Sequence, residues 1–241
     1  AFAAQGGLQA AFLSRAGVTG PEGALDGAAS LFRIYLGAQL QPRQREILLD
    51  YSTWHSCDVN IKPWPCCRLS HPYVAVALAA RQACLLRRIE RVRVAVNASA
   101  ARLCRPLPQR RRPVTLQDAK YSIPFMTAFA LVHGAPSLEN LSREVMGDER
   151  VLEIAARVEI EETLPDNPGH PLAVLTLEYE DGPADSFHFS QDDLRGDEES
   201  DRLQFFECFR HAGLEHAAEK AWQAAMGGQS RAAIRAVEQL D

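Results

Sequence analysis

The chain has 241 residues, and its 31 acidic and 26 basic side chains give a formal charge of −5 at neutral pH. Apolar residues make up 46% and charged residues 24%, as in an ordinary globular domain with a packed core. This composition excludes a collagen, a coiled coil, a disordered chain and a small disulfide-bonded scaffold.

Compartment signals point to the cytoplasm. No apolar stretch approaches the roughly 20 residues that span a bilayer, and residues 1–7 lack the regions of a signal peptide. Six cysteines scattered along the chain are too sparse for a disulfide framework. We therefore expect a cytoplasmic protein with no membrane partner.

The first 50 residues have the pattern of three helices. Leu8, Phe12 and Leu13 recur at helical spacing, and Gly17 ends the pattern. Two further helices are expected at residues 24–36 and 43–50.

Strands and helices alternate from about Trp54. Residues 55–61 predict a strand, and Pro63 and Pro65 exclude a regular helix from the loop that follows. Ser70 is expected to cap a helix that runs to about residue 88.

Further elements follow in the same alternating order. The strict alternation of residues 91–96 predicts a half-buried strand, and Asp181-Gly182 predicts a hairpin turn. A loop is expected at 103–113; helices at 115–133, 137–146, 148–156, 202–211 and 215–226; and strands at 157–162, 173–180 and 185–189. This order predicts an α+β fold in which both chain ends (1–54 and 196–241) form part of a helical domain, with an inserted α+β lid domain at 55–195.

Charge is segregated along the chain. Residues 81–112 contain ten arginines and one glutamate, whereas residues 139–201 contain nineteen acids and four arginines. The favoured interpretation is that the basic strand and loop face the acidic hairpin or water, and an anion-binding patch is the alternative. A nucleic-acid partner is disfavoured because the basic segment lacks interleaved aromatic residues and the net charge is negative.

Two of the three lysines lie in unusual local sequences. In residues 61–71, a proline-stiffened loop brings Lys62 and Arg68 close to a helix start that presents His71, and such a cationic corner suits a carboxylate. A rigid connector without function explains the same residues equally well. In residues 118–134, Lys120 and Tyr121 precede an apolar helix, and a structural role as its start is the favoured interpretation.

The spacing of the cysteines and histidines gives little support for an iron–sulfur cluster or a zinc site. Cys66 and Cys67 are adjacent, without the C-x₂-C spacing of iron–sulfur ligands, and His55 and Cys57 lack two further zinc ligands at a diagnostic spacing. We expect neither a metal nor a cofactor.

Together, these stretches resemble the MmgE/PrpD family, which includes 2-methylcitrate dehydratase, cis-aconitate decarboxylase and iminodisuccinate epimerase. Residues 62–71 are similar to the family pattern Lys-x-Tyr-Pro-x-Cys-x-x-x-His, and residues 118–125 to Asp-Ala-Lys-Phe-Ser-Ile-Pro-Phe. Residues 3–11, 16–21 and 204–208 also look like the family.

The resemblance implies a metal-free lyase that acts on a small polycarboxylate, with its active site between the helical domain and the lid. Lys62 and His71 match motif residues and are expected to be catalytic, while the expected substrate-binding residues are Arg68, Cys67, Lys120 and Tyr121. Phe125 stands where the decarboxylase branch carries a tyrosine, which argues against decarboxylation. The resemblance leads us to expect dehydration of a 2-methylcitrate-like hydroxy acid.

The family's long helical segment ahead of the stretch at residues 3–11 is missing from the sequence, and it carries the histidines usually assigned as acid and base. We therefore expect a homo-oligomer or a complementary N-terminal subunit. The alternatives are a non-catalytic or partner-dependent subunit, and a decarboxylase or epimerase of the same family.

Overall fold

The computed structural model describes residues 2–50, 52, 61–84, 87–166, 172–190 and 198–228. The chain divides into two compact units, Ala1–Val59 and Asn60–Asp241. The strand expected at residues 55–61 falls, except for Ile61, outside the described residues, as do His55 and Cys57. The expectation that residues 196–241 share a helical domain with residues 1–54 stays a prediction.

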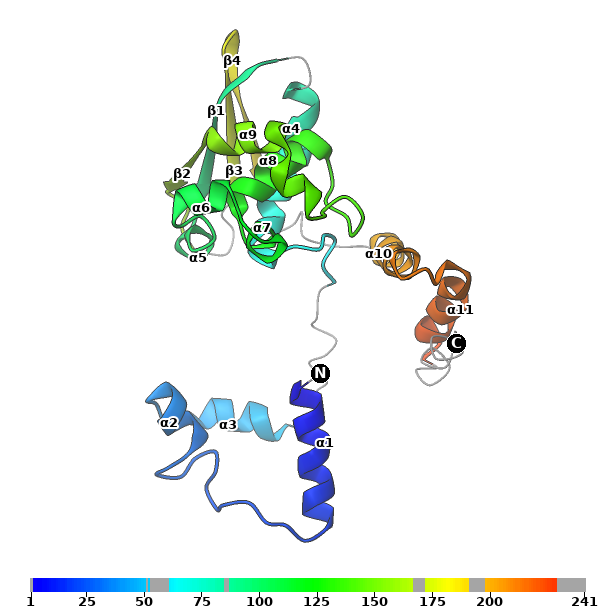
Figure 1. The fold of residues 1–241 in the computed structure, drawn as a ribbon. Coiled ribbons are helices and arrows are strands. Elements are labelled where there is room, and N and C mark those ends of the chain that lie inside the picture. Colours follow the sequence, from blue (N-terminus) through cyan, green and yellow to red (C-terminus); the bar gives the residue numbers. More distant parts are fainter. Residues whose placement is uncertain are drawn as a thin grey trace. The chain divides into compact units, whose positions relative to one another are not determined.

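Three helices form the described part of the first unit: α1 (Phe2–Arg15), α2 (Leu31–Leu36) and α3 (Pro42–Leu49) (Figure 1). The helix expected at residues 24–36 is wrong in its first half. Helix α2 begins after Ser30, whose hydroxyl accepts a hydrogen bond from the Arg33 N–H, and it ends at Gly37, where φ is 62°. None of these three helices has a buried side chain.

The second unit combines a four-stranded sheet with helices, which confirms the α+β class (Figure 1). Its strands are β1 (Ile89–Val96), β2 (Val158–Glu162), β3 (Ala173–Tyr179) and β4 (Gly182–Phe189). Its helices are α4 (His71–Cys84), α5 (Ala98–Ala101), α6 (Leu107–Arg111), α7 (Leu116–Lys120), α8 (Ile123–His133), α9 (Glu149–Ala156), α10 (Glu198–His211) and α11 (Glu215–Met226).

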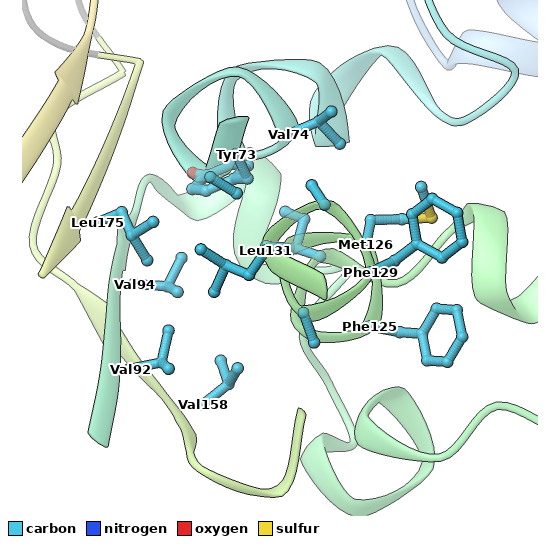
Figure 2. Close-up of a cluster of buried hydrophobic side chains, with 14 of the residues drawn as sticks. Tyr73, Val74, Val92, Val94, Phe125, Met126, Phe129, Leu131, Val158 and Leu175 are labelled. Carbon is cyan, nitrogen blue, oxygen red and sulfur yellow. The ribbon is translucent and has the colours of Figure 1, made fainter. Parts of the chain in front are cut away.

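The sheet has the order β2-β1-β3-β4. Strand β1 is parallel to β2 and antiparallel to β3, and β3 and β4 form an antiparallel hairpin at the predicted turn. Alternate residues of β1 and β3 are buried, so one face of the sheet packs into the core. Figure 2 shows Val92, Val94 and Leu175 of that face pointing toward helix α8, where Leu131 meets them.

The other face of the sheet carries paired charges. Arg93 of β1 lies 2.8 Å from Glu178 of β3 and 3.5 Å from Glu161 of β2, and Arg91 bridges the same two neighbouring strands. Further ion pairs join Arg87 to Asp185, Arg88 to Glu180 and Arg105 to Glu162. The expected pairing of the basic segment with the acidic hairpin is thus confirmed for Glu178, Glu180 and Asp185, and the structure adds ion pairs with the glutamates of β2.

Helix boundaries differ from the predictions at four places. Ser70 ends a short 3₁₀ helix at Arg68–Ser70 and directly precedes α4, but it provides no side-chain cap, because its buried hydroxyl has no hydrogen-bond partner among the described residues. The helix expected at 115–133 breaks into α7 and α8, since Ser122 caps a new helix with Pro124 in its first turn. The expected loop at 103–113 contains α6, and residues 137–146 form no α-helix. In the part of the chain that is described, no helix is long and apolar enough to cross a membrane.

Candidate functional site

A backbone hydrogen bond joins the two lysine-bearing stretches. The N–H of Cys67, in the proline-stiffened loop, donates to the carbonyl of Lys120, at the end of α7, over 2.9 Å. The loop itself is tightened by the Cys66 N–H, which donates to the Trp64 carbonyl over 2.8 Å. Residues more than fifty positions apart in the sequence therefore share one corner of the second unit.

A cavity of about 320 Å³ opens at this corner. Its lining residues are Lys62, Trp64, Pro65, Cys66, Cys67, Gln117, Lys120, Tyr121 and Gln204. Four of the six residues expected from the sequence (Lys62, Cys67, Lys120 and Tyr121) thus line the same cavity, which we call the lysine pocket.

The lysine pocket is cationic. The ammonium group of Lys62 donates to the Cys66 carbonyl over 3.4 Å, and neither Lys62 nor Lys120 has a carboxylate partner among the described residues. Among the described residues, the lining contains no acidic side chain. Two positive charges without counter-ions favour an anion in this space, and carboxylates are natural partners of ammonium groups.

His71 and Arg68 do not line the lysine pocket. The His71 side chain is 3% exposed, and its ring packs edge-on against Trp64 with the ring centroids 5.4 Å apart. Burial lowers the pKa of His71, and the nearby charge of Lys62 acts in the same direction. The ring is therefore neutral at pH 7, and its Nε2 has no hydrogen-bond partner in the described part of the chain.

Arg68 is exposed at the start of the 3₁₀ helix, outside the pocket lining. The structure therefore separates the expected site residues into a group that shares the cavity and a pair, Arg68 and His71, that adjoins it. The catalytic and substrate-binding roles expected for these six residues stay predictions.

The two adjacent cysteines have different environments. Burial raises the pKa of Cys66 to about 12, so this side chain stays a neutral thiol, whereas Cys67 is half-buried. Among the described residues, no three His, Cys, Asp or Glu side chains gather closely enough to hold a metal ion.

Gln117 and Gln204 line the pocket but were missed as candidates. Gln117 lies three positions before Lys120 and so shares its face of α7, which is a signal that helical spacing could have supplied. Gln204 comes from α10, and no local pattern could place it beside a loop some 140 residues earlier.

A larger cavity of about 600 Å³ lies elsewhere in the second unit, with Arg87, Arg88, Arg150 and Arg157 in its wall. Each of these guanidinium groups already pairs with a carboxylate: Asp185, Glu180, Asp148 and Glu153, respectively. Since these arginines are occupied, the lysine pocket is the better candidate for an anionic ligand.

Comparison with known proteins supports the resemblance seen in the sequence. A comparison with curated proteins found no match. Residues 64–168 match the model of the MmgE/PrpD C-terminal domain, a range that includes most of the pocket wall as well as α4, β1, α8 and β2. Residues 64–168 therefore correspond to an MmgE/PrpD C-terminal domain, and this match supports the family resemblance of the chain.

Proposed function

We propose that this chain provides the substrate-binding corner of an MmgE/PrpD lyase that dehydrates a small hydroxy polycarboxylate of the 2-methylcitrate type. The observation that carries the proposal is the lysine pocket, a cavity of about 320 Å³ lined by two lysines that have no acidic partner in the part of the chain that the structure describes. That volume suits a small molecule rather than a macromolecule.

Dehydration of such an acid needs three kinds of group. A base removes the proton next to a carboxylate, an acid protonates the leaving hydroxyl, and cations stabilise the charge that develops on the carboxylate. In the proposal, Lys62 and Lys120 hold the carboxylates and supply the cationic stabilisation.

The described pocket wall contains no carboxylate and no imidazole. The proposal therefore takes the base from another part of the assembled enzyme, either a second copy of the chain or a complementary subunit. His71 acts behind the wall by holding Trp64 in place. Four free cysteines among the described residues fit a reducing cytoplasm.

Binding of citrate to the purified protein, measured by calorimetry, tests the role of the lysines. We expect Lys62→Met and Lys120→Met each to weaken binding by about ten-fold or more, because hydrogen bonds to charged groups contribute roughly 1.5–3 kcal/mol. The matched control is Lys220→Met, since this third lysine is exposed on α11 and lies outside the pocket. Equal affinities for all three variants and the wild type would remove the pocket from the function.

Turnover is tested by proton NMR with a panel of small di- and tricarboxylates. Loss of water from a hydroxy acid, dependent on Lys62, supports dehydration; loss of CO₂ or inversion at carbon would favour the decarboxylase or epimerase alternative. In the structure, Phe125 is fully buried in the core, and a pocket role for this position gains no support.

A partner-dependent subunit without activity of its own is the second candidate. The observation that favours it is the exposure of large apolar side chains on the three helices of the first unit: Phe2, Leu8, Phe12, Leu31, Ile34 and Leu36 are each more than half exposed. Native mass spectrometry combined with the turnover assay distinguishes the two, because an active dimer or complex is expected for the enzyme, and a dimer or complex without turnover for the second candidate.

A further inference from the structure

Helix α10 brings Gln204, whose side chain ends in a carboxamide, to the wall of the lysine pocket. We infer that Gln204 is a specificity-determining residue that recognises the hydroxyl group of the ligand, and that Glu207 is the positioning residue that holds it there. The inference rests on the proposed function, since it adds a recognition element to the same pocket.

Helices α10 and α11 pack against each other (orange in Figure 1). Phe205 stacks on Phe209 with centroids 4.7 Å apart and meets Trp222 of α11 edge-on at 5.3 Å. Ion pairs flank this aromatic cluster: Arg202 with Glu219 and Arg210 with Glu215, each at 2.8 Å. Any restraint on α10 is therefore shared by both helices.

Gln204 and Glu207 lie three positions apart and so share a helix face, which differs from the face that Phe205 and Phe209 present to α11. The Glu207 carboxylate accepts a hydrogen bond from the backbone N–H of Leu138 over 2.7 Å. A bond to an ionised acceptor is among the stronger hydrogen bonds in proteins. Glu207 thus anchors α10 to the segment after α8, one helical turn from Gln204.

The anchoring point is itself well held. The N–H of Ser137 donates to Oδ1 of Asn140 over 2.7 Å, and Nδ2 of Asn140 donates to the Ala135 carbonyl over 2.9 Å. The Leu138 N–H therefore belongs to a turn with its own hydrogen bonds. Its bond to Glu207 restrains α10 at that residue, and so restrains Gln204 one helical turn away.

The chemistry of the pocket assigns Gln204 its role. Ammonium groups can only donate, so Lys62 and Lys120 suit carboxylate oxygens. A carboxamide both donates and accepts, and its oxygen can accept the hydroxyl proton of a hydroxy acid. Gln204 can therefore distinguish a hydroxylated polycarboxylate from one that lacks the hydroxyl by accepting the hydroxyl proton, a hydrogen bond that the lysines cannot accept.

Citrate and tricarballylate test this assignment, because they differ only by one hydroxyl group. With the full chain in calorimetry, we expect Gln204→Ala to weaken citrate binding by about five-fold, as for loss of one hydrogen bond, and to leave tricarballylate binding unchanged. Gln117→Ala is the matched control, since it removes the other carboxamide of the pocket, and it should keep the preference for citrate over tricarballylate.

Glu207 is tested by a double-mutant cycle. Glu207→Ala should weaken citrate binding about as much as Gln204→Ala, and the double variant should be no weaker than either single variant, because both changes remove the same contact. Glu207→Gln retains an acceptor oxygen and should restore most of the preference for citrate. Glu199→Ala, an exposed carboxylate of the same helix, should have no effect.

The outcomes separate the two proposals. If wild-type protein binds citrate through Lys62 but Gln204→Ala keeps the full preference over tricarballylate, the inference is overturned and the proposed function stands. The inference is overturned in the same way if Gln117→Ala alone abolishes the preference, or if the Gln204 and Glu207 effects add independently. If the wild type binds neither acid, both the proposed function and the inference are overturned.

Discussion

Cys66 and Cys67 are neighbours in the chain, yet their thiols meet different surroundings. Cys66 is buried with a raised pKa, while Cys67 lines a cavity that also contains Lys62 and Lys120. A sequence of two adjacent cysteines does not reveal which one faces the cavity. The difference follows from the loop conformation, which the hydrogen bond from Cys67 to Lys120 holds.

Alkylation of Cys67 should depend on the charge of the reagent. Because the two lysines attract anions, we predict that Cys67 reacts several-fold faster with iodoacetate, relative to iodoacetamide, than does the exposed Cys208. Peptide mass spectrometry measures both rates in one sample. Lys62→Met should lower the ratio at Cys67 alone; an unchanged ratio would argue against a cationic pocket.

His71 should make the protein sensitive to mild acid. Its pKa is lowered in the folded protein by burial, so below the ordinary value of 6.5 the unfolded chain binds a proton that the folded chain does not. The free energy of unfolding should therefore fall as the pH decreases from 7 to 5. Urea titrations should show a smaller fall for His71→Gln, and His211→Gln, which alters an exposed histidine, is the control.

At the scale of elements, Asp148 joins two helices. Its carboxylate accepts hydrogen bonds from the N–H groups of Arg150 and Val151 at the start of α9, and it lies 2.8 Å from Nε2 of His133 at the end of α8. Burial opposes ionisation, but these hydrogen bonds outweigh it and hold the pKa of Asp148 below its usual range.

Removal of the Asp148 carboxylate should loosen both helix ends. We predict that Asp148→Ala lowers the free energy of unfolding by about 1–2 kcal/mol, as for other N-cap residues. Asp148→Asn is the control, because asparagine also caps helices, and it should cost less. Since the folded pKa is lowered, this contribution is present above the unfolded value and is lost as the pH falls through the folded pKa; equal losses at pH 7 and pH 3 would contradict it.

Element types could be read from local sequence wherever the signal was local. The alternation of Val92, Val94 and Val96 predicted β1, and Asp181-Gly182 predicted the β3–β4 hairpin. The break between α7 and α8 was missed because the apolar pattern continues across it. There the hydroxyl of Ser122 caps α8 and prevents one continuous helix.

At the scale of the whole molecule, the described core cluster draws its members from between Cys66 and Phe189. Large buried side chains such as Tyr73, Phe125, Phe129 and Leu175 fill it. The three helices of the first unit contribute no buried side chain of their own. The core of the second unit is therefore complete by itself.

A fragment that spans Asn60–Asp241 should fold alone. We predict that its thermal unfolding is cooperative and that its Tm lies within about 3 °C of the full chain, because stability of a domain follows from its buried apolar surface. Calorimetry of both proteins measures this. A fragment that fails to unfold cooperatively, or a much lower Tm, would show that the first unit stabilises the core.

The sequence by itself determined the fold class and the order of most elements, and it supplied the family resemblance that the match of residues 64–168 supports. It also singled out Lys62, Cys67, Lys120 and Tyr121, which line the lysine pocket and whose roles stay predictions. Each of these depends on signals between near neighbours in the chain: periodicity, turn residues and short motifs. Tertiary structure alone decided that His71 is buried behind Trp64, that the arginines of β1 pair with glutamates of two other strands, and that Gln204 joins the pocket. These outcomes depend on which distant segments pack together, and packing depends on the shapes of both partners, which no short stretch of sequence contains.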